Sequence, residues 1–175
     1  MAADDPPSPG SGPGAGGNGF PRDRIEIRLP SRADFLGAVR TVVRGLLEEC
    51  LPVRITEEEI HGIQMALQEA CINAVRHAHR NDPSVPVVVG ITARPDLLVL
   101  EIEDRGPGIP DREHQPPDPD PDNPREGGYG LFIMRETMDE VRSERRGDRH
   151  VLVLVKRLVP RGPEGGAGAP PGSGT

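Results

Sequence analysis

Residues 55–80 read ITEEEIHGIQMALQEACINAVRHAHR, and this stretch decides the fold prediction. Its apolar side chains recur at intervals of three and four residues, at Ile60, Ile63, Leu67, Ala70, Cys71, Ala74, Val75 and Ala78. That spacing places one apolar stripe along a helix. Thr56, followed three residues later by Glu59, predicts a capping box at the helix start. We therefore predict an amphipathic helix over residues 56–80.

Two polar residues of this helix are not needed for its apolar face. Glu69 and Asn73 are spaced i, i+4, so their side chains stand one above the other beside the stripe. A carboxylate and a carboxamide placed in this way can hold a water, a metal ion or a hydroxyl group between them. Taken alone, Glu69 is better explained as a solvated carboxylate on a helix surface.

The bulk properties indicate one folded domain between two low-complexity ends. The chain has 175 residues, which suggests a single domain. Residues 1–20 and 160–175 are dominated by Gly, Pro, Ser and Ala and cannot bury enough apolar surface to offset the entropy of ordering. We therefore predict two disordered tails and a folded domain over residues 21–159.

Charge and apolar content exclude several classes of protein. The net charge of −7 argues against general binding of nucleic acid, which needs a basic face. The acidic N-terminus lacks the apolar run of a signal peptide, and no apolar segment approaches the length that spans a membrane. Cys50 and Cys71 lie in apolar helical patterns and are predicted to be buried thiols in a reducing compartment. We expect a cytoplasmic protein with no direct nucleic-acid or membrane contact.

The remaining apolar patterns predict further strands and helices. Strands are expected at residues 24–29, 86–93, 97–102 and 151–158, and helices at residues 34–51 and 131–141. The two middle strands are separated by a short turn and are predicted to form an antiparallel hairpin. This order of elements predicts an α+β fold, with helices packed on one face of a mixed, mainly antiparallel sheet.

A long polar loop precedes the last predicted helix. Residues 111–126 contain no hydrophobic side chain and five prolines. A loop of this length inside a compact domain is often a lid or a binding loop. We predict a lid over residues 109–128.

Two glycine motifs flank this loop. Asp104-x-Gly106-x-Gly108 follows a predicted strand, where the glycines permit close approach of a ligand to the backbone. Gly127-Gly128-x-Gly130 opens a predicted helix, whose N-terminal N–H groups can bind an anion. Taken alone, the first motif is better explained as a turn, and the second is a weak signal that also fits a flexible loop before a helix.

The three motifs taken together, in this order, resemble the N, G1 and G2 boxes of the GHKL ATPase superfamily. The local wording QEACINAVRHA, EDRGPGI and EGGYGLFIMRETMDEV is similar to the branch of bacterial anti-sigma-factor serine/threonine kinases. The resemblance covers about residues 25–158 and implies the Bergerat-type two-layer sandwich of that superfamily. It departs from the family in one place, because the Gly-Thr pair that many members carry before the last strand is absent from residues 147–150.

The resemblance implies a role for each matching residue. Asn73 would coordinate a Mg²⁺ ion that bridges the phosphates of ATP, and Asp104 would accept a hydrogen bond from the adenine amino group. Glu69 would be the general base that takes the proton from an attacking serine hydroxyl. The remaining predicted nucleotide-binding residues are Gly106, Gly108, Gly127, Gly128, Gly130 and Leu131.

The resemblance also implies a function with named classes of partner. An anti-sigma factor of this kind phosphorylates a small anti-sigma-factor antagonist and sequesters a sigma factor, so that the two partners compete for it. Two alternatives stay open: a nucleotide-gated binding module without kinase activity, and a histidine-kinase-like catalytic domain. Relatives tend to pair, and the first predicted strand offers an edge, so we also expect a homodimer.

Overall fold

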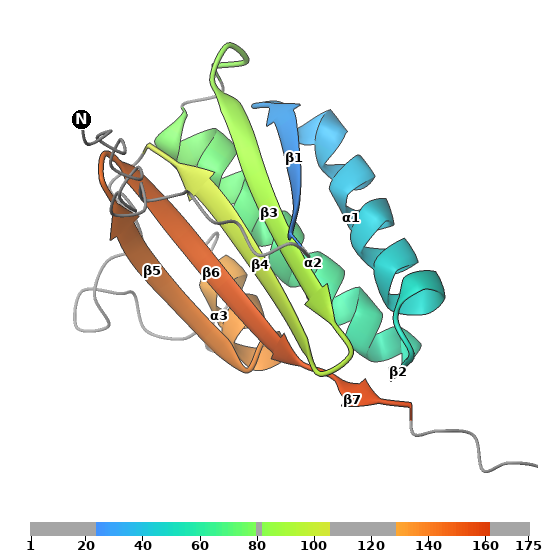
Figure 1. Ribbon diagram of the computed structural model, residues 1–175. Helices are drawn as coiled ribbons and strands as arrows, with labels where there is room; N and C mark the ends of the chain where they lie inside the picture. Colours follow the sequence, from blue (N-terminus) through green and yellow to red (C-terminus); the bar gives the residue numbers. More distant parts are fainter. Residues whose placement is uncertain (1–23, 80–81, 106–128, 162–175) are drawn as a thin grey trace, which may run out of the picture.

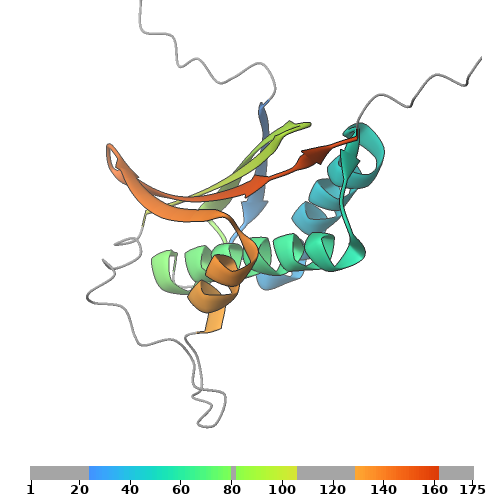
Figure 2. The ribbon, with the colours of Figure 1, turned by 90° about the horizontal axis from the view of Figure 1, so that it is seen from below.

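The fold consists of two layers, a five-stranded sheet with the helices on one of its faces (Figures 1 and 2). It is seen in a computed structural model that describes residues 24–79, 82–105 and 129–161. In chain order the elements are β1 (Arg24–Pro30), η1 (Ala33–Phe35), α1 (Leu36–Gly45), η2 (Leu46–Cys50), β2 (Val53–Arg54), α2 (Glu57–Asn73), η3 (Ala74–Ala78), β3 (Pro86–Arg94), β4 (Leu97–Asp104), α3 (Tyr129–Thr137), β5 (Glu140–Arg146), β6 (Arg149–Arg157) and β7 (Val159–Pro160).

The strands of the large sheet follow the order β1-β3-β4-β6-β5, and each neighbouring pair is antiparallel. Side chains alternate between the two faces, so one row of paired residues shows what faces the helices. That row is apolar in every strand, and consists of Ile25, Ile91, Leu100, Leu154 and Val141. The predicted α+β class, the mainly antiparallel sheet and the β3–β4 hairpin are confirmed.

The predicted central helix is α2, and its apolar stripe faces the sheet. Seven of the eight stripe residues are buried, namely Ile60, Ile63, Leu67, Ala70, Cys71, Ala74 and Val75. The capping box is present: Thr56 Oγ accepts from the Glu59 N–H at 3.2 Å, and the Glu59 carboxylate accepts from the Thr56 N–H at 2.8 Å. Local sequence therefore sets both the start of this helix and its orientation.

The two long helices each end in a wider, π-helical turn. The turns are η2 after α1 and η3 after α2, and they close with bonds from Leu51 N–H to Leu46 O and from His79 N–H to Ala74 O, both 3.0 Å. Such turns are frequent near functional sites. The predicted helices thus persist almost to their expected ends, with a change of winding in the last turn.

The predicted third helix was wrong at its C-terminal end. It stops at Thr137, and the strand β5 follows. Opposite charges alternate along this strand, so that Arg142 Nε pairs with Glu144 at 2.7 Å and Arg146 Nη2 pairs with Glu144 at 2.6 Å. Residues two apart share a face in a strand and not in a helix, which is why these ion pairs favour β5.

The described structure continues past the predicted domain boundary at residue 159. Pro160 belongs to β7 and pairs with Val53 of β2, and Arg161 N–H donates to Pro52 O at 2.6 Å. The predicted N-terminal tail and the predicted lid fall outside the described residues.

The predictions on the two cysteines and on membrane-spanning segments can also be compared with the described residues. Cys71 is buried as predicted, but Cys50 is exposed, because η2 turns it away from the core. None of the helices in the described ranges is long and apolar enough to cross a membrane.

Candidate functional site

The helices α2 and α3 pack together at two glycines. A Cβ atom at Gly62 would lie 2.9 Å from Thr137 Cγ2, and a Cβ atom at Gly130 would lie 2.7 Å from Glu69 Oε2. A Cβ at either position would therefore fit only if the facing side chain moved, Thr137 in the first case and Glu69 in the second. The earlier residue of α2 faces the later residue of α3, and the later residue of α2 faces the earlier one. The helices α2 and α3 are therefore antiparallel neighbours (Figure 2).

This packing places Glu69 at the N-terminal end of α3. Because α3 begins at Tyr129, Gly130 lies in its first turn, where backbone N–H groups lack partners within the helix. The positive end of the helix dipole favours an anion here. Asn73 follows Glu69 by one helical turn, and both side chains are half-buried. The fold therefore brings a carboxylate, a carboxamide and a helix N-terminus together.

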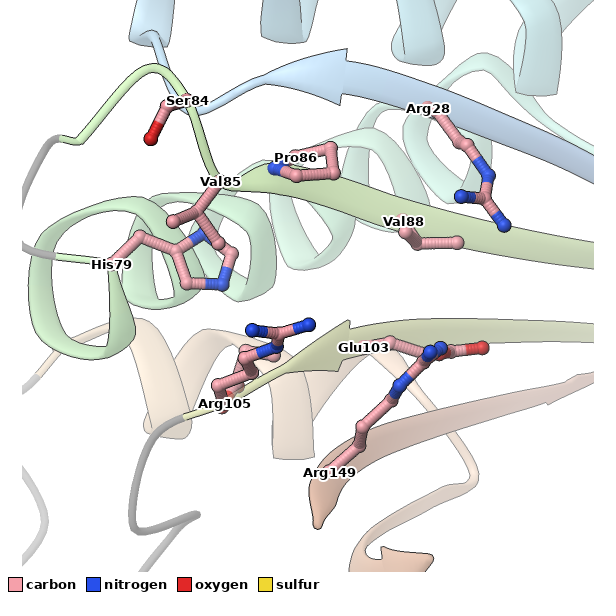
Figure 3. A pocket seen from close by; sticks show the side chains of 10 residues that line it. Arg28, His79, Ser84, Val85, Pro86, Val88, Glu103, Arg105 and Arg149 are labelled. Carbon is pink, nitrogen blue, oxygen red and sulfur yellow. The ribbon is translucent and has the colours of Figure 1, made fainter.

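Asp104 ends the strand β4 at one end of the sheet. The last residue pair between β3 and β4 is Val88 with Glu103, whereas β4 and β6 remain paired as far as Asp104 and His150. The two strands β3 and β4 thus separate before Asp104. A cavity of about 190 Å³ lies at this end of the sheet (Figure 3). Its lining includes Asp104 together with the outer-face residues Glu103 and Arg149.

His79 lies in the wall of this cavity, at the end of the helix that carries Glu69 and Asn73 (Figure 3). Ser31 Oγ donates to Val85 O at 2.6 Å and lies 2.6 Å from His79 Nδ1. Since the hydroxyl proton is used for Val85, the proton of the second bond must be on Nδ1. Burial lowers the pKa of His79, which favours the neutral ring with Nε2 as an acceptor.

At this end of the sheet, charged side chains of neighbouring residues lie on opposite faces. Glu103 points to the outer face and pairs with Arg149 at 2.8 Å. Asp104 and His150 are the next residues along these strands, so they share the inner face with the helices. The end of α2 and the Asp104 end of β4 therefore bound one region on the inner side of the sheet.

The described residues include five of the nine predicted site residues. Glu69, Asn73, Gly130 and Leu131 lie on the two packed helices, and Asp104 lies at the end of β4. The other four predicted residues fall outside the described ranges, and are Gly106, Gly108, Gly127 and Gly128. Sequence reasoning missed His150 as a neighbour of Asp104, because only strand register brings the two together.

The sequence profile of the histidine kinase-like ATPase domain family matches residues 29–156. The chain belongs to this family. It is 32% identical to the serine-protein kinase RsbW of Bacillus subtilis over 127 residues, which cover 69% of the chain and 77% of that protein. It is 30% identical to the RsbW of Bacillus licheniformis, over 79% of the chain and 88% of that protein. The predicted GHKL family and its anti-sigma-factor kinase branch are confirmed.

One further relative agrees with this assignment, and one solved structure shares the fold. The chain is 27% identical to the anti-sigma F factor of Geobacillus kaustophilus, over 79% of the chain and 94% of that protein. A crystal structure of the RsbU and RsbW domains of a Mycobacterium tuberculosis protein matches with a TM-score of 0.51 and 21% identity. That match covers 77% of this chain and 32% of the other, and it supports the fold alone.

Proposed function

We propose that this protein is an ATP-dependent serine/threonine protein kinase that phosphorylates an anti-sigma-factor antagonist and also sequesters a sigma factor. The names of its relatives, serine-protein kinase RsbW and anti-sigma F factor, support both halves of the proposal. The order of the three sequence motifs supports the nucleotide site within it.

The observation that carries the proposal is the contact between Glu69 and Gly130. The predicted base and the predicted phosphate-binding glycine motif come from different helices, yet a Cβ at Gly130 would lie 2.7 Å from Glu69 Oε2. A general base must lie within hydrogen-bond reach of the hydroxyl that attacks the phosphate. The contact supports the assignment, because it puts the Glu69 carboxylate at the end of α3 where we propose that the phosphates bind.

We assign nucleotide recognition to the end of β4 and to the glycine motifs, the second of which reaches into the first turn of α3. Asp104, half-buried at the cavity between β3 and β4, accepts from the adenine amino group. The backbone around the glycines contacts the rest of the nucleotide, at Gly106, Gly108, Gly127, Gly128, Gly130 and Leu131.

Magnesium fits the residues at the phosphate end. Mg²⁺ keeps several waters and binds through one or two protein oxygens together with phosphate oxygens, and the half-buried Asn73 provides one such oxygen. The described part of the chain holds no group of three or more His, Cys, Asp or Glu residues that would bind a metal without the nucleotide. When bound, the ion neutralises phosphate charge.

In the reaction, the hydroxyl oxygen of a serine or threonine forms a bond to the γ-phosphorus of ATP. The bond between that phosphorus and the bridging oxygen breaks, and ADP leaves with the electron pair. The Glu69 carboxylate takes the hydroxyl proton. Positioning and charge neutralisation supply most of the rate enhancement in such transfers, so Glu69 must be held in place by its contact with α3.

Phosphorylation would decide which partner the protein holds. The unmodified antagonist would displace the sigma factor, and the phosphorylated antagonist would leave the kinase free to bind it. This regulation takes place where RNA polymerase works, in the cytoplasm.

We also assign a homodimer, for which β1 provides a sheet edge, since within the described residues it pairs with β3 alone. Light scattering that finds only monomer at high concentration would refute the dimer.

The test mixes the purified protein with Mg-ATP and candidate antagonists, and locates new phosphate by mass spectrometry. We expect phosphoserine or phosphothreonine on the antagonist. Glu69→Gln should abolish the transfer and keep ATP binding, whereas Glu58→Gln, at an exposed position of the same helix, should change neither. Undiminished transfer by the Glu69 variant would refute the base assignment. Nucleotide-dependent antagonist binding with no transfer would favour a binding module, and phosphohistidine would favour a histidine-kinase-like domain.

A further inference from the structure

Lys156 joins the sheet to the C-terminal end of α3. It is paired with Leu98 in the β4–β6 register, and Leu98 is buried in the core, so the lysine side chain lies on the helical face of the sheet. Its Nζ atom donates to the backbone oxygen of Thr137, the last residue of α3, at 2.7 Å. A lysine on the inner face of β6 therefore binds the end of a neighbouring helix.

This bond satisfies a carbonyl that the helix itself leaves without a partner. The last four carbonyl groups of an α-helix have no N–H partner within it, and β5 begins at Glu140, so no further helical turn supplies one. The negative end of the helix dipole lies at the same place and favours a cation. Lys156 thus gives the end of α3 both a hydrogen bond and a compensating charge.

The ammonium group of Lys156 lies where the ends of two helices meet. Hydrogen bonds from the backbone and the side chain of Thr56 lower the pKa of Glu59, and the charge of Lys156 contributes to the same shift. Glu59 belongs to the first turn of α2, so Lys156 is close to the start of α2 as well as to the end of α3. The contact between Gly62 and Thr137 belongs to the same junction, which therefore joins α2, α3 and β6.

This junction lies at the opposite end of α3 from Glu69. Because α2 and α3 are antiparallel, the other end of α3 meets Glu69 at Gly130 (Figure 2). Nine residues with a rise of about 1.5 Å each place the two ends of α3 about 12 Å apart. Carbonyl groups point along the helix axis, so a bond to the last one resists sliding of α3 along its axis, whereas side-chain packing acts mainly across it. A slide of α3 would move Gly130 relative to Glu69.

We propose that Lys156 is a positioning residue for phosphate transfer, which fixes α3 along its axis and thereby fixes the second glycine motif relative to the Glu69 carboxylate. This inference rests on the proposed function, and it gives a role to a residue outside all three sequence motifs. A displacement of α3 changes the geometry of the reacting groups and leaves the adenine contact at β4 in place. Loss of Lys156 therefore acts on kcat more than on ATP affinity.

The test uses the antagonist that the native protein phosphorylates, and measures kcat together with the calorimetric affinity for Mg-ATP. Lys156→Met removes the donor and keeps an unbranched side chain. We expect kcat to fall about tenfold, less than the about 10²-fold that a 1 Å misplacement can cost, and the affinity to change less than about threefold. Lys156→Arg restores a donor and should recover most of kcat. Arg157→Met is the matched control, because this exposed neighbour lies on the opposite face of β6, and it should change neither quantity.

A double variant separates positioning from a general loss of stability. Gly130→Ala displaces the Glu69 carboxylate, and without Lys156 the helix α3 can slide to make room for the added methyl group. Lys156→Met should therefore lower kcat much less in the Gly130→Ala background than in the native background. Two independent effects would instead multiply.

Four results would overturn the inference and leave the kinase proposal intact: an unchanged kcat in Lys156→Met, an equal loss in Arg157→Met, no recovery in Lys156→Arg, or effects that multiply in the double variant. A Lys156→Met protein that no longer binds ATP would show a purely structural role and would overturn it as well. A native protein that binds ATP and phosphorylates no antagonist would overturn both proposals.

Discussion

Glu69 and Gly130 meet in a contact that leaves no space for another atom. A Cβ at position 130 would lie 2.7 Å from Glu69 Oε2 and 3.4 Å from Glu69 Cβ. The contact links α2, which is anchored in the core, to the first turn of α3. The position of the proposed base therefore depends on the absence of a side chain on the neighbouring helix.

Replacing this glycine should separate catalysis from nucleotide affinity. Gly130→Ala must displace the Glu69 carboxylate, and a misplacement of about 1 Å can cost about 10²-fold in rate. We expect kcat for phosphate transfer to fall by about that factor, with a smaller change in ATP affinity, measured by steady-state kinetics and calorimetry. Gly37→Ala is the matched control, because no described atom lies within 4 Å of a Cβ there. An unchanged kcat in Gly130→Ala would contradict the placement of Glu69.

The second glycine contact predicts a rescue between two positions. A Cβ at Gly62 would lie 2.9 Å from Thr137 Cγ2, the methyl group that Thr137→Ser removes. Overpacking costs about 1–3 kcal/mol, and alanine returns about 1 kcal/mol of helix propensity. Gly62→Ala should thus lower the free energy of unfolding by up to about 2 kcal/mol, and should be neutral or stabilising when Thr137→Ser is present. Urea unfolding measures both, and identical effects in the two backgrounds would show that the helices do not pack in this way.

His79 should make stability depend on pH in the mildly acidic range. Burial lowers its pKa, with opposing contributions from Asp104 and Asp82 and a further lowering by Arg105. Between this lowered value and the ordinary value of about 6.5, the unfolded chain binds more protons than the native protein. Stability should therefore rise with pH through this window and be lost as pH falls below about 6.5.

Urea midpoints measured between about pH 5 and pH 8 test this dependence. His79→Gln should flatten the curve in that window, and His61→Gln, at an exposed site on α2, should leave it as in the native protein. A native curve that does not change with pH, or one that keeps its slope in His79→Gln, would show that His79 titrates normally.

The two cysteines should react at very different rates. Cys50 is exposed, whereas burial raises the pKa of Cys71 to about 12 and removes its reactive thiolate. Ellman's reagent should modify one thiol quickly in the native protein and the second only on unfolding. Cys50→Ala should abolish the fast phase and Cys71→Ala the slow one. Rapid modification of both thiols in the native state would contradict the packing of α2 against the sheet.

The sequence predicts those parts of the fold that depend on residues close together in the chain, and misses parts that depend on contacts between distant residues. The helix α2 could be predicted because its apolar spacing and its Thr56–Glu59 cap are local. The strand β5 was missed because the apolar residues Met138 and Val141 suggested that the helix continued. The alternation of charge from Glu140 to Arg146 pointed to a strand, but its ion pairs become visible only on a sheet face.

The same distinction between local spacing and contacts distant in sequence applies to the candidate site. Glu69 and Asn73 could be selected because helical spacing alone puts them on one face. Their partner Gly130 could be named from its motif, but its contact with Glu69 depends on how two helices pack. No motif marks His150, since its position beside Asp104 follows from the register of two strands that are distant in sequence.

The central claim is that the ends of α2, α3 and β4 together bind a magnesium-bound adenine nucleotide. Calorimetric titration of Mg-ATP into the native protein and into Asp104→Asn tests it most directly. The amide presents a donor toward the adenine amino group and removes a charged acceptor, a loss of about 1.5–3 kcal/mol. We predict saturable binding by the native protein and about 10- to 100-fold weaker binding by the variant. No heat of binding with the native protein, or equal affinity in the two proteins, would contradict the account.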